Sequence, residues 1–293
     1  MAGKIKDIIP ESIKQPLRPL QKAASQLKTS YLMKFSRIHP APVIILGNPK
    51  SGTSAIAALV GRAAGKTVII DMFHLIKEPN FRELLYSGEM PLRDLMERYK
   101  FYFSTEIIKE THLTFFYAQL AEYFPQAKFA IVVRDPRANI RSILNRLKIP
   151  GNLEVLPDSY LDNFNSVEVK GWRLQLEGKL PDVPGANYIE RMAHRWNIAA
   201  DVYLQHPDKV VLMRYEDFMQ DKVGTIGKLT RQLGWEPVND ISDRVDVQYQ
   251  PRGDRSIAWR EFFGAENLRR IETICGDRMQ QFNYQPSSPD TST

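Results

Sequence analysis

The chain of 293 residues has 43% hydrophobic and 25% charged side chains, which is enough apolar material to bury one large core. No apolar run approaches the roughly 18 to 20 residues of a membrane span, and no apolar stretch ending in a small-residue cleavage site stands near the first residues. The single cysteine, Cys275, excludes an internal disulfide and a cysteine-based zinc site. We therefore expect one globular, cytoplasmic domain in which Cys275 is an ordinary helix residue.

The excess of positive charge lies at the start of the chain. The first 40 residues hold eight basic and two acidic side chains, which accounts for the whole net charge of +6. Because the rest is balanced, the basic pI of 9.2 does not indicate nucleic acid as a partner. Residues 1–40 are predicted to form a basic helical extension that packs on its own domain or contacts a membrane surface or a partner. Its apolar residues recur at helical spacing, namely Leu20, Ala24, Leu27, Tyr31 and Phe35.

After the extension, short β-rich runs alternate with helical stretches, which is typical of a parallel sheet flanked by helices. Strands are predicted at 43–46, 67–70, 106–109, 128–133 and 209–213. Helices are predicted to begin near Thr53, Leu92, Phe115, Pro136, Tyr188 and Asp217. The expected fold class is α/β, a single three-layer domain over residues 41–285 with a central, mainly parallel sheet. Within it, residues 148–186 form a Pro- and Gly-rich segment too long for an ordinary connection, which predicts a lid or substrate wall. A disordered tail is expected over 286–293.

The first predicted strand leads into the loop Asn-Pro-Lys-Ser-Gly-Thr-Ser, residues 48–54. A glycine at position 52 lets a ligand approach the backbone, and the amides at the start of the next helix favour an anion. Hydroxyl donors come from Ser51, Thr53 and Ser54. A nucleotide-hydrolase loop of the form G-x-x-x-x-G-K-[ST] has its lysine directly after Gly52, whereas the lysine here is Lys50. That position indicates a shorter phosphorylated group than a nucleoside triphosphate.

A second motif, "FAIVVRDPRANIRSIL", follows the fourth predicted strand. Arg134 leaves the sheet at its carboxyl edge, Asp135 can cap the next helix, and Pro136 suits the first turn. Ser142 comes two turns into that helix. An arginine fork and a hydroxyl could therefore bind one phosphate beside the crevice at this edge.

Together these segments resemble the PAPS-dependent sulfotransferases, which take a sulfuryl group from 3′-phosphoadenosine 5′-phosphosulfate (PAPS) and release adenosine 3′,5′-bisphosphate (PAP). The resemblance implies that the first loop binds the 5′-phosphosulfate with Lys50 at the bridging oxygen. Arg134 and Ser142 would bind the 3′-phosphate. "YQPRGDR", residues 249–255, is similar to the family's loop over that phosphate, with Arg252 and Gly253 as the matching residues. The likeness runs from Pro42 to Tyr284.

Two further segments of the chain resemble the family. "LMRYEDF", residues 212–218, contains Tyr215, which we expect to help hold adenine because Ala55 replaces the family's stacking tryptophan. "KETHL", residues 109–113, offers Lys109 to the transferring sulfuryl oxygens. His112 is the expected base for the acceptor proton, because imidazole titrates near neutral pH, and Glu110 is the alternative base.

The acceptor is expected to be a hydroxyl or amine of a small molecule, a glycan or a lipid headgroup, with Asp71 and His74 near it. In-line sulfuryl transfer requires positioning and charge stabilisation, and no metal in principle. Two alternatives stay open. One is a P-loop kinase or nucleotide hydrolase with an atypical loop, and the other is a non-catalytic nucleotide-binding protein of the same fold.

Overall fold

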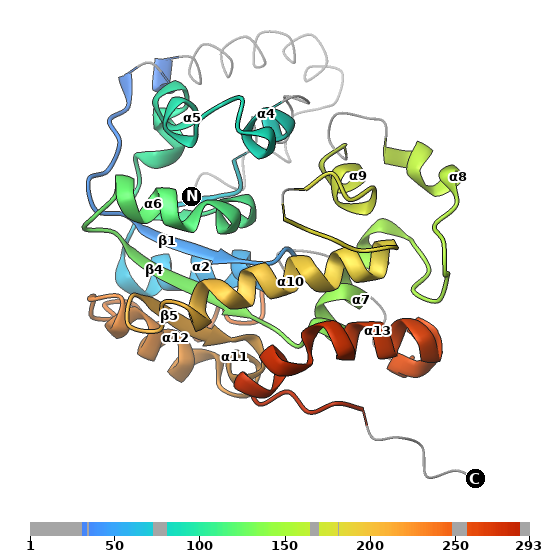
Figure 1. The fold of residues 1–293 in the computed structure, drawn as a ribbon. Coiled ribbons are helices and arrows are strands. Elements are labelled where there is room, and N and C mark those ends of the chain that lie inside the picture. Colours follow the sequence, from blue (N-terminus) through green and yellow to red (C-terminus); the bar gives the residue numbers. More distant parts are fainter. Residues whose placement is uncertain are drawn as a thin grey trace, which may run out of the picture.

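A five-stranded parallel sheet forms the centre of the molecule in a computed structural model, which describes residues 31–33, 35–72, 81–164, 170–180, 182–247 and 257–287 (Figure 1). The strand order is β2-β3-β1-β4-β5, and the four pairings between neighbours are parallel. The strands are β1 Val43–Gly47, β2 Val68–Ile70, β3 Ile107–Lys109, β4 Lys128–Val133 and β5 Val210–Arg214. The chain crosses from one side of β1 to the other between β3 and β4, so the carboxyl end of β1 is the expected place for a ligand.

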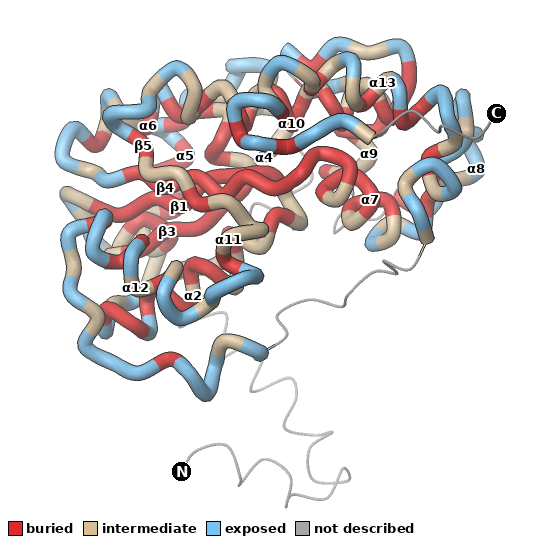
Figure 2. Tube along the Cα trace, turned by 90° about the horizontal axis from the view of Figure 1, so that it is seen from below, coloured by how far each residue is buried: buried red, intermediate tan, exposed pale blue. Residues whose placement is uncertain are grey.

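Helices cover both faces of the sheet, which therefore forms a buried middle layer (Figure 2). In β1, Val43 and Ile45 pack with one group of helices, whereas Ile44 and Leu46 pack with the other. This alternation follows from the two-residue period of a strand, and it explains why β1 is apolar throughout. The first group is α2 Thr53–Ala64, α11 Tyr215–Gln220 and α12 Lys222–Gln232. The second includes α5 Leu92–Arg98, α6 Tyr117–Tyr123, α7 Pro136–Leu147, α10 Tyr188–Leu204 and α13 Trp259–Gln281.

The predicted strands are all present, each within one residue of its predicted bounds. Four predicted helix starts, at Thr53, Leu92, Pro136 and Tyr188, are also confirmed. The helix predicted near Phe115 begins two residues later, at Tyr117, because a 3-10 helix, η2 Thr111–Phe116, precedes it. The helix predicted near Asp217 begins two residues earlier, at Tyr215. There the chain forms two helices, α11 and α12, because the Asp221 carboxylate accepts from the backbone N–H of Gly224 and starts the second one.

The segment 148–186 contains more regular structure than its composition indicates. Its short helices are α8 Asp158–Leu161, η3 Asp162–Phe164 and α9 Lys170–Leu176. Two further short helices precede the third strand, α4 Phe81–Ser87 and η1 Lys100–Phe103. Cys275 is a buried helix residue, as predicted, and belongs to α13.

Only part of each predicted terminal segment lies within the described residues. Tyr31 and Phe35 are exposed, with ring centroids 4.6 Å apart, whereas Met33 packs against the core. At the other end, the backbone N–H of Ser287 donates to Glu272 of α13 at 2.8 Å. Among the described helices, none has the length and hydropathy to cross a membrane.

Candidate active site

The loop between β1 and α2 turns sharply at three residues with positive φ, Gly47 at 136°, Lys50 at 68° and Gly52 at 91°. A Cβ at Gly47 would lie 2.6 Å from the carbonyl oxygen of Val132, so only glycine fits there. Lys50 adopts the left-handed conformation without being glycine, which costs about 1 to 3 kcal/mol and is typical of functional loops. No side chain caps the start of α2 at Gly52. Its first amides therefore have no side-chain cap and could bind an anion.

Two side chains from the strand-helix unit β4–α7, whose strand lies beside β1 in the sheet, hold this loop in place. The Nδ2 group of Asn139 donates to the carbonyl oxygen of Pro49 at 2.8 Å and to the hydroxyl of Ser51 at 3.0 Å. The guanidinium of Arg134 donates to the carbonyl oxygen of Lys50 at 2.9 Å. Sequence reasoning missed Asn139, although it lies in the same motif as Arg134 and Ser142, because its role depends on a contact between elements 90 residues apart.

Arg134, Tyr215 and the loop are in contact with one another. The guanidinium carbon of Arg134 lies 4.6 Å from the centroid of the Tyr215 ring, within the range of a cation–π contact. A Cβ built on Gly52 would lie 2.6 Å from that same ring, so Tyr215 rests directly on the loop. The indole N–H of Trp196 donates to the carbonyl oxygen of Arg134 at 2.8 Å. Arg134 is thus fixed through its backbone and its side chain.

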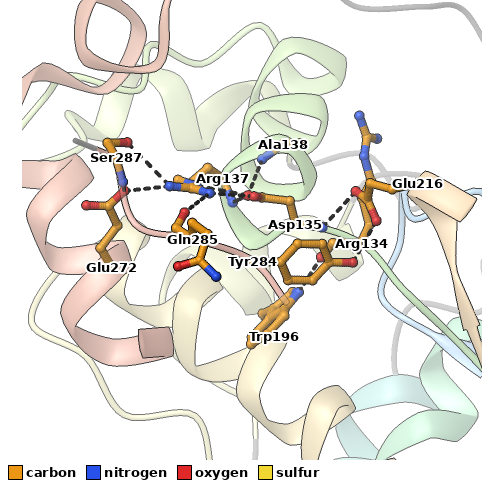
Figure 3. A network of polar contacts seen from close by, with 10 residues as sticks. All are labelled: Arg134, Asp135, Arg137, Ala138, Trp196, Glu216, Glu272, Tyr284, Gln285 and Ser287. Carbon is orange, nitrogen blue, oxygen red and sulfur yellow. Dashed lines mark hydrogen bonds and ion pairs between the residues drawn. The ribbon is translucent and has the colours of Figure 1, made fainter. Parts of the chain in front are cut away.

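A polar network fastens the end of β4 to α11 and to the C-terminal part of the chain (Figure 3). Asp135 caps α7 and pairs with the guanidinium of Arg137, which also reaches Glu272 of α13 at 2.7 Å. The backbone N–H of Asp135 donates to Glu216 at 3.1 Å. Glu216 in turn accepts from the Tyr284 hydroxyl at 2.6 Å. This network stabilises the turn that carries Arg134.

At the carboxyl end of β3, Lys109 is paired across the sheet with Ile45 of β1. Its ammonium group is buried and lies 2.5 Å from the carboxylate of Asp71, which follows β2. Asp71 has a φ of 61° and is the second non-glycine residue with a left-handed conformation at this edge of the sheet. Lys109 and Asp71, both singled out from the sequence, are therefore in direct contact.

Glu110 and His112 occupy different environments, because the 3-10 helix η2 begins between them. Glu110 is only 2% exposed, and its two carboxylate oxygens accept from the backbone N–H groups of Met72 and His112, each at 3.0 Å. His112 is half-buried, and its Nδ1 atom is hydrogen bonded to the Tyr86 hydroxyl of α4. Burial and then the cations of Arg82, Arg195 and Lys109 hold the pKa of His112 well below its ordinary value. Burial raises the pKa of Tyr86 to about 12. Both groups are therefore neutral at pH 7.

Thr114 fastens η2 to the loop. Its hydroxyl accepts from the backbone N–H of Gly47 at 3.0 Å and lies 3.2 Å from the carbonyl oxygen of the same residue, to which it also donates. A hydroxyl has one proton and two lone pairs, so both bonds can form together. The turn with His112 is thereby held against the start of the phosphate loop. The sequence offered no signal for this role of Thr114.

The comparison with protein families decides the class of this protein. The family model described as Sulfotransferase domain matches residues 40–250. The chain belongs to the sulfotransferase family. A comparison with curated proteins found no match.

The fold of this sulfotransferase resembles those of solved sulfotransferase structures. STF9 from Mycobacterium avium is 13% identical with a TM-score of 0.54, over 92% of this chain and 83% of that one. Mouse SULT7A1 complexed with PAP is 17% identical with a TM-score of 0.47, over 86% and 88% of the two chains. The expected fold class, an α/β domain with a parallel sheet and a phosphate-loop-like turn, is confirmed.

The remaining predicted residues of this sulfotransferase lie around the same edge or outside the described residues. Ser142 is half-buried on α7, next to Arg141, whose guanidinium donates to the carbonyl oxygen of Ile257 at 2.8 Å. Ile257 directly follows the segment that contains Arg252 and Gly253, and those two residues, like His74, lie outside the described part of the chain. Within the described ranges, no group of three or more His, Cys, Asp or Glu side chains is arranged to hold a metal ion.

Proposed function

We propose that this sulfotransferase moves a sulfuryl group from PAPS to a hydroxyl or amine of an acceptor. One observation carries the proposal. The uncapped start of α2 and Lys50 follow β1, the neighbouring strand β3 ends at Lys109, and Thr114 holds the turn with His112 against Gly47. An anion site, two lysines and a neutral imidazole thus lie at one edge of the sheet. Sulfuryl transfer needs these groups and little else.

The loop and its neighbours fit the phosphate groups of the donor. The free amides at the start of α2, with Ser51, Thr53 and Ser54, suit the 5′-phosphosulfate. Arg134 and Ser142, with Arg252 and Gly253 from the later loop, would hold the 3′-phosphate, and Tyr215 would lie beside the adenine. Bound PAPS supplies the activated sulfuryl group. Lys50 would neutralise the charge that grows on the leaving oxygen, and Lys109 would contact the sulfuryl oxygens.

His112 fits the role of base better than Glu110. The bond from acceptor oxygen to sulfur forms as the bond from sulfur to the bridging phosphate oxygen breaks, and the acceptor proton must go to a nearby group. In the tautomer that donates Nδ1–H to the Tyr86 hydroxyl, the Nε2 atom of His112 carries the lone pair that would take this proton. Glu110 is only 2% exposed, and its oxygens accept from the backbone N–H groups of Met72 and His112, so we assign it the role of positioning His112.

A kinase or nucleotide hydrolase fits less well. No lysine follows Gly52, and the first residue after β4 is Arg134, not an acidic residue that could hold Mg²⁺. The next residue, Asp135, is occupied by the cap of α7 and by Arg137. The other alternative, a non-catalytic protein that binds the same nucleotide, is distinguished by the experiment below.

Calorimetry with PAP, AMP and ATP plus Mg²⁺, followed by turnover with sulfur-labelled PAPS and a panel of alcohols and amines, tests the proposal. PAP should bind without metal and about 10-fold or more tighter than AMP, because each charge-assisted hydrogen bond to the 3′-phosphate contributes about 1.5 to 3 kcal/mol. Lys50→Ala should reduce turnover far more than PAP affinity, since the leaving charge develops only in the transition state. Lys66→Ala, beyond the far end of the same helix, is the matched control. Preference for ATP with Mg²⁺ would favour the hydrolase, and PAP binding without any transfer would favour the non-catalytic protein.

A further inference from the structure

Three donor side chains from three helices gather near His112, and one of them, Arg195, also contacts the first residue of the phosphate loop. Arg195 of α10 donates to the Asn48 side chain at 3.3 Å and to the Gln175 side chain of α9 at 2.9 Å. Arg82 of α4 lies against α9 so closely that a Cβ on Gly171 would be 1.5 Å from its guanidinium. We call Arg82, Gln175 and Arg195 the donor cluster.

The donor cluster has more hydrogen-bond donors than the protein uses. Arg195 is 2% exposed and Gln175 is 1% exposed. Even so, the Nη2 group of Arg195, the Nε2 group of Gln175 and the Nε group of Arg82 are buried and have no hydrogen-bond partner within the described structure. Buried donors are nearly always satisfied in native proteins, so three together indicate a ligand that supplies acceptors.

The charge of the donor cluster is only partly neutralised by the described residues. No ion pair joins Arg82 or Arg195 to a carboxylate in the described ranges, and Glu110 is the one carboxylate among the groups that act on the charge of Arg195. Burial lowers the pKa of Arg195 to about 10, so it stays charged at neutral pH. Two guanidinium groups beside one carboxylate leave an excess of positive charge, which a bound anion would compensate.

An apolar wall adjoins the donor cluster and the base. Leu174, Leu180 and Val183 form a small buried group, against which Tyr86 and Phe115 pack. The guanidinium carbon of Arg195 lies 5.0 Å from the centroid of the Phe115 ring, and the Tyr86 hydroxyl reaches His112. Cationic donors, apolar side chains and the reacting base therefore lie together.

We infer that the acceptor of this sulfotransferase carries a carboxylate or a similar anionic group on an apolar body, and that the donor cluster binds this group while the acceptor hydroxyl faces His112. The inference rests on the proposed sulfuryl transfer and adds the class of acceptor. Bound PAPS would not account for the donor cluster, because the uncapped start of α2, Lys50 and Arg134 already provide for the phosphates of PAPS.

Three matched acceptors test the inference with the full chain: 4-hydroxyphenylacetate, its neutral amide, and tyramine, which replaces the anion with a cation. With labelled PAPS, kcat/KM should be about 10- to 100-fold higher for the carboxylate than for the amide, as expected for charge-assisted hydrogen bonds, and lowest for tyramine. Arg195→Met should remove most of this preference, and any change in PAP affinity through its contact with Asn48 should be smaller than that loss. Lys179→Met deletes the same charge from an exposed position just after α9 and should keep the preference. Arg195→Lys, the variant to use if Arg195→Met does not fold, should retain part of it.

A binding measurement separates this inference from the proposed function. Phenylacetate should raise the melting temperature of the PAP-loaded protein more than phenylacetamide does, and Arg195→Met should abolish the difference. Failure to bind PAP would refute the proposed function, while a carboxylate-specific shift of the unloaded protein would still support the donor cluster. Equal responses to carboxylate and amide, or a loss of PAP affinity in Arg195→Met that exceeds its loss of carboxylate preference, would overturn the inference.

Discussion

Replacing His112 with glutamine should lower turnover by about 10²-fold, the lower end of the range for general-base catalysis. The lower end applies because burial and the surrounding cations hold the pKa of His112 well below its ordinary value, and a weaker base lowers the barrier less. This factor corresponds to about 2.7 kcal/mol of transition-state stabilisation. Glutamine retains a polar side chain that can still meet the Tyr86 hydroxyl, so the fold and PAP affinity should change little.

Turnover at saturating PAPS and calorimetric PAP affinity, measured for the wild type and for His112→Gln, decide this prediction. His206→Gln is a matched control, because His206 lies beyond the end of α10 with its ring 4.8 Å from that of Tyr117. A decrease of less than about 3-fold in turnover would refute the assignment of His112 as the base. An equal loss of PAP affinity would assign it to donor binding instead.

The pH dependence gives a second measurement on the same residue. His112 accepts a proton only when it is neutral. Its lowered pKa means that, in the protein without PAPS or PAP, it stays neutral as the pH falls to 6.5 and becomes protonated only at a lower pH. The negative charge of a bound donor raises that pKa, so an NMR titration should show a higher value with PAP than without it. Because the folded pKa lies below the unfolded one, stability should fall as the pH decreases from 6.5 towards the folded pKa, and His112→Gln should weaken this dependence. A titration of the free protein at or above 6.5 would contradict the described environment.

Three further predictions concern the support of the site. Glu110→Ala leaves the N–H groups of Met72 and His112 without an acceptor and should cost about 1 to 3 kcal/mol each in thermal unfolding, whereas Glu110→Gln keeps an acceptor and should cost less. Equal losses for the two variants would contradict the capping role. Asp135→Ala removes the cap of α7 and a partner of the buried Arg137, and urea unfolding should show a loss of about 3 to 5 kcal/mol. A loss below about 1 kcal/mol would mean that the remaining contacts of Arg137 are enough to compensate its buried charge without Asp135. Cys275 is fully buried, and burial raises the pKa of its thiol, so iodoacetamide should label it only after unfolding. Rapid labelling of the folded protein would show that α13 opens.

The sequence by itself determined the strands, most helix starts and the phosphate loop, because these features depend on neighbouring residues. The apolar run of β1 is buried on both faces and stays readable as a strand whatever packs against it. Gly52 before an uncapped helix, with Lys50 two residues earlier, is a local signal for an anion site. The same holds for the cap of α7, since Asp135 and Pro136 are adjacent in the chain.

Tertiary structure alone decided how the groups at the edge of the sheet divide their roles. An extended chain would place Glu110 and His112 on one side, and only the 3-10 turn between them turns the glutamate to backbone N–H groups and the histidine ring to the Tyr86 hydroxyl. The donor cluster comes from three helices, and nothing near Arg195 in the sequence shows that its guanidinium reaches Asn48, 147 residues away. Such contacts depend on how the helices pack on the sheet. Burial then decides which side chains keep their charge and which hydrogen-bond donors lack a partner. These two properties determine which ligand fits the site.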